Sequence, residues 1–187
     1  VPVGNFSKGG YEFDYPTLSK TAYEANTRDT SGTKLEASAL AGVQKALTQS
    51  GCTMVSAPAE VSLLKRDTLM TAVRVDFGSA TARPTAIVRV DGSSVRPVPA
   101  SWSWADGRLT ANVRLTEGGI LVPVTTSART FSDVPADAWY TQVVNEAVQR
   151  LWMNGTGSDR FSPEGELTGA QLRAILLRIL GVPEEKA

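Results

Sequence analysis

The sequence has no histidine and only one cysteine, Cys52, among its 187 residues. Without these side chains it cannot build the usual zinc sites, a Ser–His or Cys–His nucleophile pair, or an internal disulfide. Its apolar runs are short, so no helix is predicted to insert into a membrane. The 19 basic residues balance 19 acidic ones, and this zero net charge argues against a nucleic-acid partner. We therefore expect a non-catalytic protein with no metal site and no cofactor.

Charge is distributed unevenly along the chain. Residues 1–129 carry 14 basic and 11 acidic side chains, a net charge of +3, whereas residues 130–187 carry 5 and 8, a net charge of −3. A change of sign partway along a chain favours two modules, which we predict at 1–129 and 130–187. The chain opens with Val1-Pro2-Val3, without Met or an export leader, so we expect a processed chain or a fragment.

The first module is predicted to be β-rich, with one helix. Apolar residues recur at helical spacing over 34–49, and alternating aromatic and acidic residues indicate a short strand over 11–15. Asp-Gly pairs at 91–92 and 106–107 predict tight hairpins between antiparallel strands. Together with a helical C-terminal unit, these elements define an α+β fold. The other predicted strands are 69–77, 86–90, 95–98, 101–104, 108–115 and 120–125.

Two tryptophans, Trp102 and Trp104, stand two residues apart on a predicted strand, so their side chains share one face. Paired indoles can stack on sugar rings, which makes this face a candidate sugar platform. A buried face, with Ser101 and Ser103 directed to water, is the simpler interpretation and the one we favour. Cys52 has no neighbour in sequence that would activate it, so we expect an inert thiol.

Two amphipathic helices joined by a loop are predicted within residues 131–181. In the first, over 139–150, apolar residues recur every three or four positions and form one face. Gly155 is predicted to adopt a left-handed turn after this helix. The second helix begins at Thr168, which fits a capping box with Gln171. The apolar residues assigned to the two faces are Trp139, Val143, Val144, Ala147, Val148 and Leu151, and Leu172, Ile175, Leu176 and Ile179.

This C-terminal pattern resembles the surface-layer homology (SLH) domain of bacterial cell-envelope proteins. The order and spacing of four short motifs carry the resemblance, which leaves residues 1–129 unassigned. The matching motifs are Phe131-Ser-Asp-Val-Pro-Ala-Asp-Ala-Trp-Tyr140, Asn154-Gly-Thr-Gly157, Phe161-Ser-Pro-Glu-Gly165 and Leu167-Thr-Gly-Ala-Gln171.

The resemblance implies non-covalent anchoring to the cell wall of a Gram-positive type of envelope. SLH domains bind secondary cell-wall polysaccharide, often pyruvylated, and three copies usually pack together with ligand grooves between them. One helix–loop–helix cannot bury both apolar faces by itself, so we expect other SLH units as partners, in the same protein or by self-association. The implied location is extracellular, in the cell wall or S-layer.

The sequence departs from the family at Gly169, where the second-helix motif usually has an arginine that meets the anionic sugar. A guanidinium can pair bidentately with a carboxylate, whereas glycine offers only a backbone N–H. The sequence also holds a single complete copy of the motif set. We therefore expect this lone unit to bind pyruvylated polymer weakly or not at all.

Seven residues are candidates for polysaccharide binding, and several have a sufficient structural explanation. Asp133 can hold a loop through backbone N–H groups, and Trp139 can belong to the core or to a groove wall. Arg173 is either a solvated surface residue or a source of positive charge near the missing arginine. The candidates are Asp133, Trp139, Gly155, Thr168, Gly169, Gln171 and Arg173.

Two functions remain open from the sequence. The favoured one is a cell-surface structural protein, in which a β-rich module of unknown ligand is anchored or assembled on the wall by the SLH unit. The alternative is a carbohydrate-binding or accessory module of an extracellular glycoside hydrolase, with the SLH unit only a packing partner.

Overall fold

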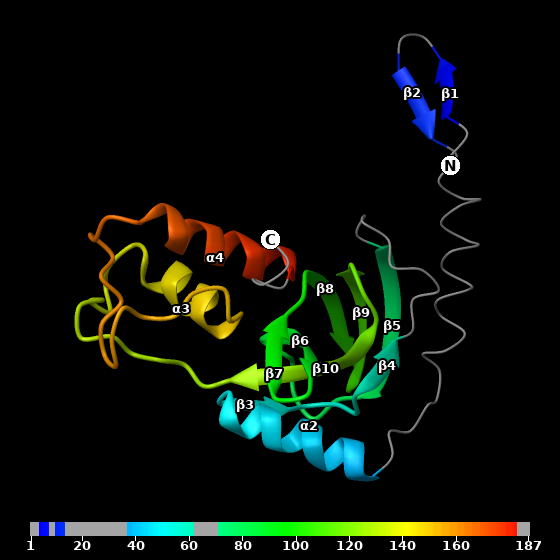
Figure 1. Cartoon of the computed structure of the whole chain (residues 1–187), viewed down its shortest axis with the longest axis horizontal. Helices are drawn as coiled ribbons and strands as arrows, with labels where there is room; N and C mark the ends of the chain where they lie inside the picture. The colour runs from blue at the N-terminus through cyan, green and yellow to red at the C-terminus, as the bar shows by residue number, and fades with distance from the viewer. Residues whose placement is uncertain (1–3, 8–9, 14–36, 62–70, 183–187) are drawn as a thin grey trace.

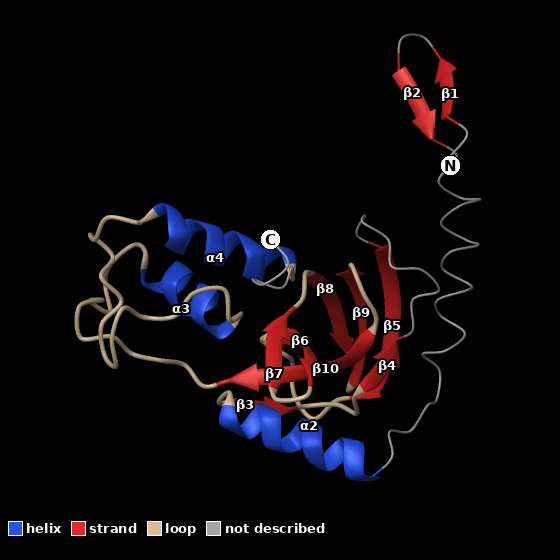
Figure 2. Cartoon of the chain, viewed as in Figure 1, coloured by secondary structure: helices blue, strands red, loops and turns tan. Residues whose placement is uncertain are grey.

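The computed structural model describes residues 4–7, 10–13, 37–61 and 71–182 (Figure 1). These residues form antiparallel sheets and three helices, which confirms the predicted α+β class. Figure 2 shows a β-rich part, residues 37–126, and a helical part, residues 131–182. Within the described ranges no helix is long and apolar enough to cross a membrane.

Ten strands are present among the described residues, and all their pairings within sheets are antiparallel. They are β1 (Gly4–Ser7), β2 (Gly10–Phe13), β3 (Cys52–Met54), β4 (Ala59–Val61), β5 (Thr71–Ser79), β6 (Ala86–Asp91), β7 (Ser94–Pro97), β8 (Ala100–Ala105), β9 (Arg108–Leu115) and β10 (Gly119–Thr126). The larger sheet has the order β3-β10-β6-β7, with β4 also paired to β10, and the smaller has the order β5-β9-β8. The β1–β2 hairpin confirms part of the strand predicted over 11–15; residues 14 and 15 lie outside the described ranges.

The larger sheet is buried on both faces. On one face Ile87 and Leu121 belong to a core shared with the smaller sheet. On the other face Val88 and Val122 pack with α2 (Ala37–Gln49), the helix predicted over 34–49. Strands covered on both sides carry apolar residues on both faces rather than in alternation, as β6 does over residues 86–88 and β10 over residues 120–124.

Both Asp-Gly pairs form tight hairpins, as predicted. Asp106 and Gly107 join β8 to β9 with φ angles of 51° and 73°, the left-handed pair that a two-residue type I′ turn requires. Gly92, with φ of 56°, begins the turn between β6 and β7. These turns follow from local backbone preferences, which explains why the sequence could predict them.

The tryptophan pair is less buried than we expected. Trp102 is half-buried and packs against the core between the sheets, but Trp104 is 42% exposed. The buried-face prediction is wrong for Trp104 because β8 is an edge strand of the smaller sheet and pairs with β9 on one side only. Cys52 is buried, and this burial raises the pKa of its thiol, as expected for an inert cysteine.

The helical part consists of α3 (Thr141–Gln149), α4 (Gly169–Leu180) and the loops around them. A small core holds it together. Its buried side chains are Phe131, Val144 and Val148, and Val134, Tyr140 and Phe161 pack against them.

The predicted apolar face of the first helix is only partly correct. Val144 and Val148 are buried, but Val143 is 62% exposed and Trp139, which precedes α3, is 87% exposed. Phe131, from the preceding loop, packs on one side of α3 and thereby decides which side becomes the core. Helical spacing alone does not contain that information.

Much of the apolar surface of α4 is uncovered. None of its side chains is fully buried by the described part of the chain, and Leu172, Leu176 and Leu180 are 46%, 48% and 47% exposed. Their spacing of four residues aligns them in one row, here called the leucine stripe. A second SLH unit covering this stripe stays a prediction.

Both ends of α4 have the capping residues that the sequence predicts. The Gln171 backbone N–H donates to the Thr168 hydroxyl at 3.2 Å, and the Thr168 N–H donates to Oε1 of Gln171 at 2.9 Å, which confirms the capping box. Gly181 ends the helix in the left-handed region, with φ of 66°. A Cβ at this position would also lie only 2.8 Å from Cδ of Pro99, so glycine allows α4 to approach the β-rich part closely.

We expect Thr168→Ala to lower the free energy of unfolding of the helical part by about 1 kcal/mol, because the variant loses the side-chain acceptor of the cap. Thr168→Ser retains a hydroxyl and is the matched control. Unfolding in urea, monitored by hydrogen exchange of the α4 amides, measures the difference in stability. Equal stability of the two variants would contradict the cap's contribution.

Candidate functional site

The structure does not bring the seven candidate residues together at one site. Gly155 and Gln171 line a pocket of about 470 Å³ between α4 and the loops before it. Trp139 lines a separate groove of about 720 Å³, together with Trp102. The candidates that are absent from the described lining of both are Asp133, Thr168, Gly169 and Arg173.

Asp133 organises the loop that follows α3. Its carboxylate oxygens accept hydrogen bonds from the backbone N–H groups of Phe161, at 2.9 Å, and Ser162, at 2.8 Å. The Phe161 N–H lowers the pKa of Asp133 most strongly, and the Ser162 N–H and the charge of Arg160 act in the same direction. The charged carboxylate is therefore stabilised within its own loop. This is the structural role that we expected for Asp133.

Gly155 is needed for close packing rather than for a left-handed turn. The left-handed residue after α3 is Leu151, with φ of 61°, so the sequence prediction for Gly155 is wrong. A Cβ at Gly155 would collide with the carbonyl oxygen of Arg160 and lie 2.6 Å from the ring of Phe131. The chain folds back onto its own core at this point, and only glycine leaves the space.

The first turn of α4 is open around Gly169. A Cβ built at this residue has no heavy atom within 4 Å outside its own helix turn, so an added β-carbon fits without displacement. Thr168 and Gln171 hydrogen-bond to each other in the capping box. Arg173 is exposed.

The groove beside Trp139, here called the tryptophan groove, lies between β8 and α3. The Trp139 indole is 87% exposed and meets the Tyr140 ring in a T-shaped contact, with 5.6 Å between ring centroids. Most of the indole surface is therefore open to solvent. The groove is also lined by polar groups that can donate or accept hydrogen bonds, among them Thr85, Gln142, Asn145, Glu146 and Gln149.

Arg150 fixes the two walls of the tryptophan groove to each other. Its guanidinium carbon lies 5.4 Å from the Trp102 ring centroid and 5.0 Å from that of Trp152, both within cation–π range. The Thr126 hydroxyl, at the end of β10, donates a hydrogen bond of 2.8 Å to the Gln149 carbonyl. These contacts dock the end of α3 on the β-rich part.

Sequence reasoning missed the role of Arg150. The spacing of Glu146 and Arg150 does predict their ion pair, which measures 2.8 Å. The contact with Trp102 joins distant segments, and no local signal indicates it. The exposed position of Trp139 likewise depends on which side of α3 the loops cover.

The family comparison matches most of the helical part. Residues 130–172 match the model of the S-layer homology domain, which confirms the resemblance seen in the sequence. Two curated relatives extend this result. The chain is 35% identical over 68 residues to the S-layer protein sap of Bacillus anthracis. It is 34% identical over 68 residues to an S-layer protein of Bacillus thuringiensis subsp. finitimus.

These alignments cover a minor part of each protein. Each spans 36% of this chain and 8% of the relative's length, so 68 residues of this chain correspond to a small segment of the S-layer proteins that they match. No solved structure matches the chain.

Proposed function

We propose that this chain is part of a bacterial cell-surface protein and that its S-layer homology domain attaches it to the cell wall through wall polysaccharide. The observation that carries the proposal is the family match at residues 130–172, supported by two relatives that are named S-layer proteins. The role is structural anchoring rather than catalysis.

The tryptophan groove is where we expect the polysaccharide chain to bind. A pyranose ring presents C–H groups of partial positive charge, which are attracted to the π face of an indole. Trp139 offers a largely exposed indole, and Gln142 and Asn145 offer amide groups for sugar hydroxyls. Because Trp102 and Trp139 come from different parts of the fold, the groove requires the docking by Arg150.

We expect Trp139→Ala to weaken binding of wall polysaccharide fragments about tenfold, the loss that corresponds to one aromatic stacking contact. Trp104→Ala is the matched control, because Trp104 is also exposed but is absent from the described lining of the groove. Isothermal titration of both variants against the same fragment measures the effect. Undiminished binding by Trp139→Ala would exclude the groove as the binding site.

Gly169 is absent from the described lining of the tryptophan groove, so Gly169→Arg tests a second contact, between the first turn of α4 and an acidic unit of the polymer. We expect this variant to raise affinity for an anionic wall polymer by roughly ten- to a hundredfold, the size of a charge-assisted hydrogen bond. The gain should shrink in high salt, since the new contact is ionic and partly exposed. The free energy of unfolding should change by only a few tenths of a kcal/mol. An added Cβ meets no neighbouring atom, and the positive end of the helix dipole repels the added charge only weakly. Gly169→Gln is the control for side-chain size, and an equal gain from it would contradict the electrostatic explanation.

The leucine stripe is the surface where we expect another SLH unit to pack. Exposed apolar side chains that are aligned on one helix commonly mark an interaction surface. The partner unit would come either from the same parent protein or from a second copy of this chain. The partner unit would bury the exposed leucines of α4. The α4 helix already contacts β7 of this chain.

A further inference from the structure

The turn that ends α3 contains a residue in an unfavourable backbone conformation. Leu151 has a φ of 61°, in the left-handed region that a bulky side chain rarely adopts. The Leu151 N–H donates to the Val148 carbonyl at 2.9 Å, and the next N–H, of Trp152, donates to the Ala147 carbonyl at 3.0 Å. These are the hydrogen bonds of a Schellman motif, in which the left-handed residue is usually glycine. The fold therefore keeps a strained leucine where glycine would fit more easily.

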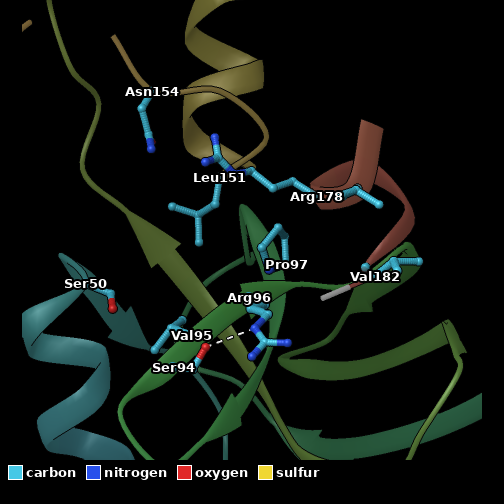
Figure 3. Close-up of a pocket in the computed structure, with 11 residues that line it drawn as sticks. Ser50, Ser94, Val95, Arg96, Pro97, Leu151, Asn154, Arg178 and Val182 are labelled. Atoms are coloured by element: carbon cyan, nitrogen blue, oxygen red, sulfur yellow. Dashed lines mark hydrogen bonds between the residues drawn. The ribbon is translucent and has the colours of Figure 1, made fainter. Parts of the chain in front are cut away.

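The Leu151 side chain packs in the other part of the molecule. It lies against the core that α2 forms with the larger sheet, where Val95 of β7 packs as well. Figure 3, a close-up of the pocket that both residues line, shows the Leu151 side chain pointing from the end of α3 toward the strands of the β-rich part. Strained backbone persists only where the surrounding structure requires it. Here the left-handed conformation directs this side chain into that core.

The residues on either side of Leu151 strengthen the same contact. The Arg150 guanidinium carbon lies 5.0 Å from the ring centroid of Trp152 and 5.4 Å from that of Trp102 on β8. Nε of Arg150 also donates a hydrogen bond of 2.9 Å to the Glu146 carboxylate, which fixes the guanidinium over these rings. Residues 150–152, here called the clasp, thus hold the helical part against both the larger and the smaller sheet.

The clasp lies beside the tryptophan groove. Trp102 lines the groove from β8 and Trp139 lines it from the segment before α3, and Arg150 belongs to the same lining. The helical part also meets the β-rich part at Gly181, but that residue is absent from the described lining of the groove. Interfaces within one chain permit relative motion unless they are large and apolar. Undocking at the clasp is therefore the motion that would separate the walls of the groove.

We infer that Leu151 is a positioning residue for the tryptophan groove, and that the clasp couples polysaccharide binding to the docking of the two parts. The inference rests on the proposed function, because the groove is where we expect the polysaccharide to bind. Only the docked form presents Trp102 and Trp139 in one groove, so a polysaccharide that contacts both binds the docked form. Binding then stabilises docking, and undocking releases the polysaccharide.

The test compares the native chain with Leu151→Gly. Glycine adopts the left-handed conformation without strain, so the turn after α3 should persist while the inserted side chain is lost. In NMR relaxation measurements, we expect the amides of α3 and β9 to share one tumbling time in the native chain. The α3 amides should tumble faster than those of β9 in the variant. If the docked form falls to about a tenth of the molecules, affinity for a wall polysaccharide fragment falls about tenfold.

Three further variants separate positioning from a general loss of structure. Leu151→Met keeps an apolar side chain of similar volume and should retain docking and affinity. Leu151→Ala shortens the side chain without freeing the backbone, and it decides the question if Leu151→Gly unfolds α3. Leu167→Gly removes a leucine that is 53% exposed and lies outside the clasp, so both measurements should stay at their native values. Across all variants, affinity should fall in proportion to the docked fraction.

Each outcome bears on one of the two claims. One common tumbling time in both Leu151→Gly and Leu151→Ala would overturn the positioning role. Undocking with undiminished affinity would overturn the coupling and leave the proposed function intact. A native chain that binds no polysaccharide would contradict the proposed function and the coupling with it, whereas undocking of Leu151→Gly would still support the positioning role. An equal loss of affinity in Leu167→Gly would overturn the inference, because the effect would then not depend on the clasp.

Discussion

Replacing Phe131 with alanine is expected to unfold the helical part while the β-rich part stays folded. Phe131 is one of three buried side chains in the core of the helical part, and the rings of Phe131 and Phe161 lie 5.4 Å apart. Truncating a buried phenylalanine costs about 3–5 kcal/mol. A folded part of roughly 50 residues has a total stability of on the order of 3–8 kcal/mol. The substitution therefore removes most of the available stability.

Hydrogen exchange measured by mass spectrometry resolves the two parts of the chain. Peptides from α3 and α4 should lose their protection in Phe131→Ala, whereas peptides from β6 and β9 should keep theirs. Trp139→Ala removes a larger aromatic side chain from the same segment, but one that is 87% exposed, and should leave protection unchanged. Native-like protection of α3 in Phe131→Ala would refute this assignment of the core.

Gly155→Ala is expected to destabilise the helical part by about 1–3 kcal/mol, the usual penalty for forcing an extra methyl group into a packed site. The added Cβ would overlap the Arg160 carbonyl and the Phe131 ring, so the loop would have to move away from the core. Gly157→Ala is a matched control in the same turn, because a Cβ at Gly157 has no neighbour within 4 Å. Thermal melting of the two variants measures the difference. Equal melting temperatures would contradict the close approach at Gly155.

Local signals in the sequence were sufficient for the two Asp-Gly hairpins and for both ends of α4, but not for the turn after α3, where Leu151 rather than Gly155 is left-handed. The Asp106-Gly107 turn depends on the backbone freedom of its own two residues, and the Thr168 cap depends on a residue three positions away. Neither requires knowledge of distant segments. The α+β class followed for the same reason, since strand composition and helical spacing are both local properties.

Properties that depend on distant contacts were not predictable in this way. Helical spacing placed Trp139 and Val143 on the same face as Val144, but Phe131 packs on only one side of α3. The contact between Arg150 and Trp102 joins the helical part to an edge strand of a different part. The sequence could therefore indicate which residues are candidates for binding but not how they are arranged in space. The structure places these candidates on separate surfaces.

Cosedimentation of the full chain with purified cell walls, before and after removal of the wall polysaccharide, tests the central claim most directly. The claim is that the S-layer homology domain attaches the chain to that polysaccharide. Because Gly169 stands where the family usually has an arginine, we predict weak attachment: the sedimented fraction rises with the amount of intact wall, stays partial, and falls to background with stripped walls. Equal sedimentation with intact and stripped walls, or none with either, would contradict the claim.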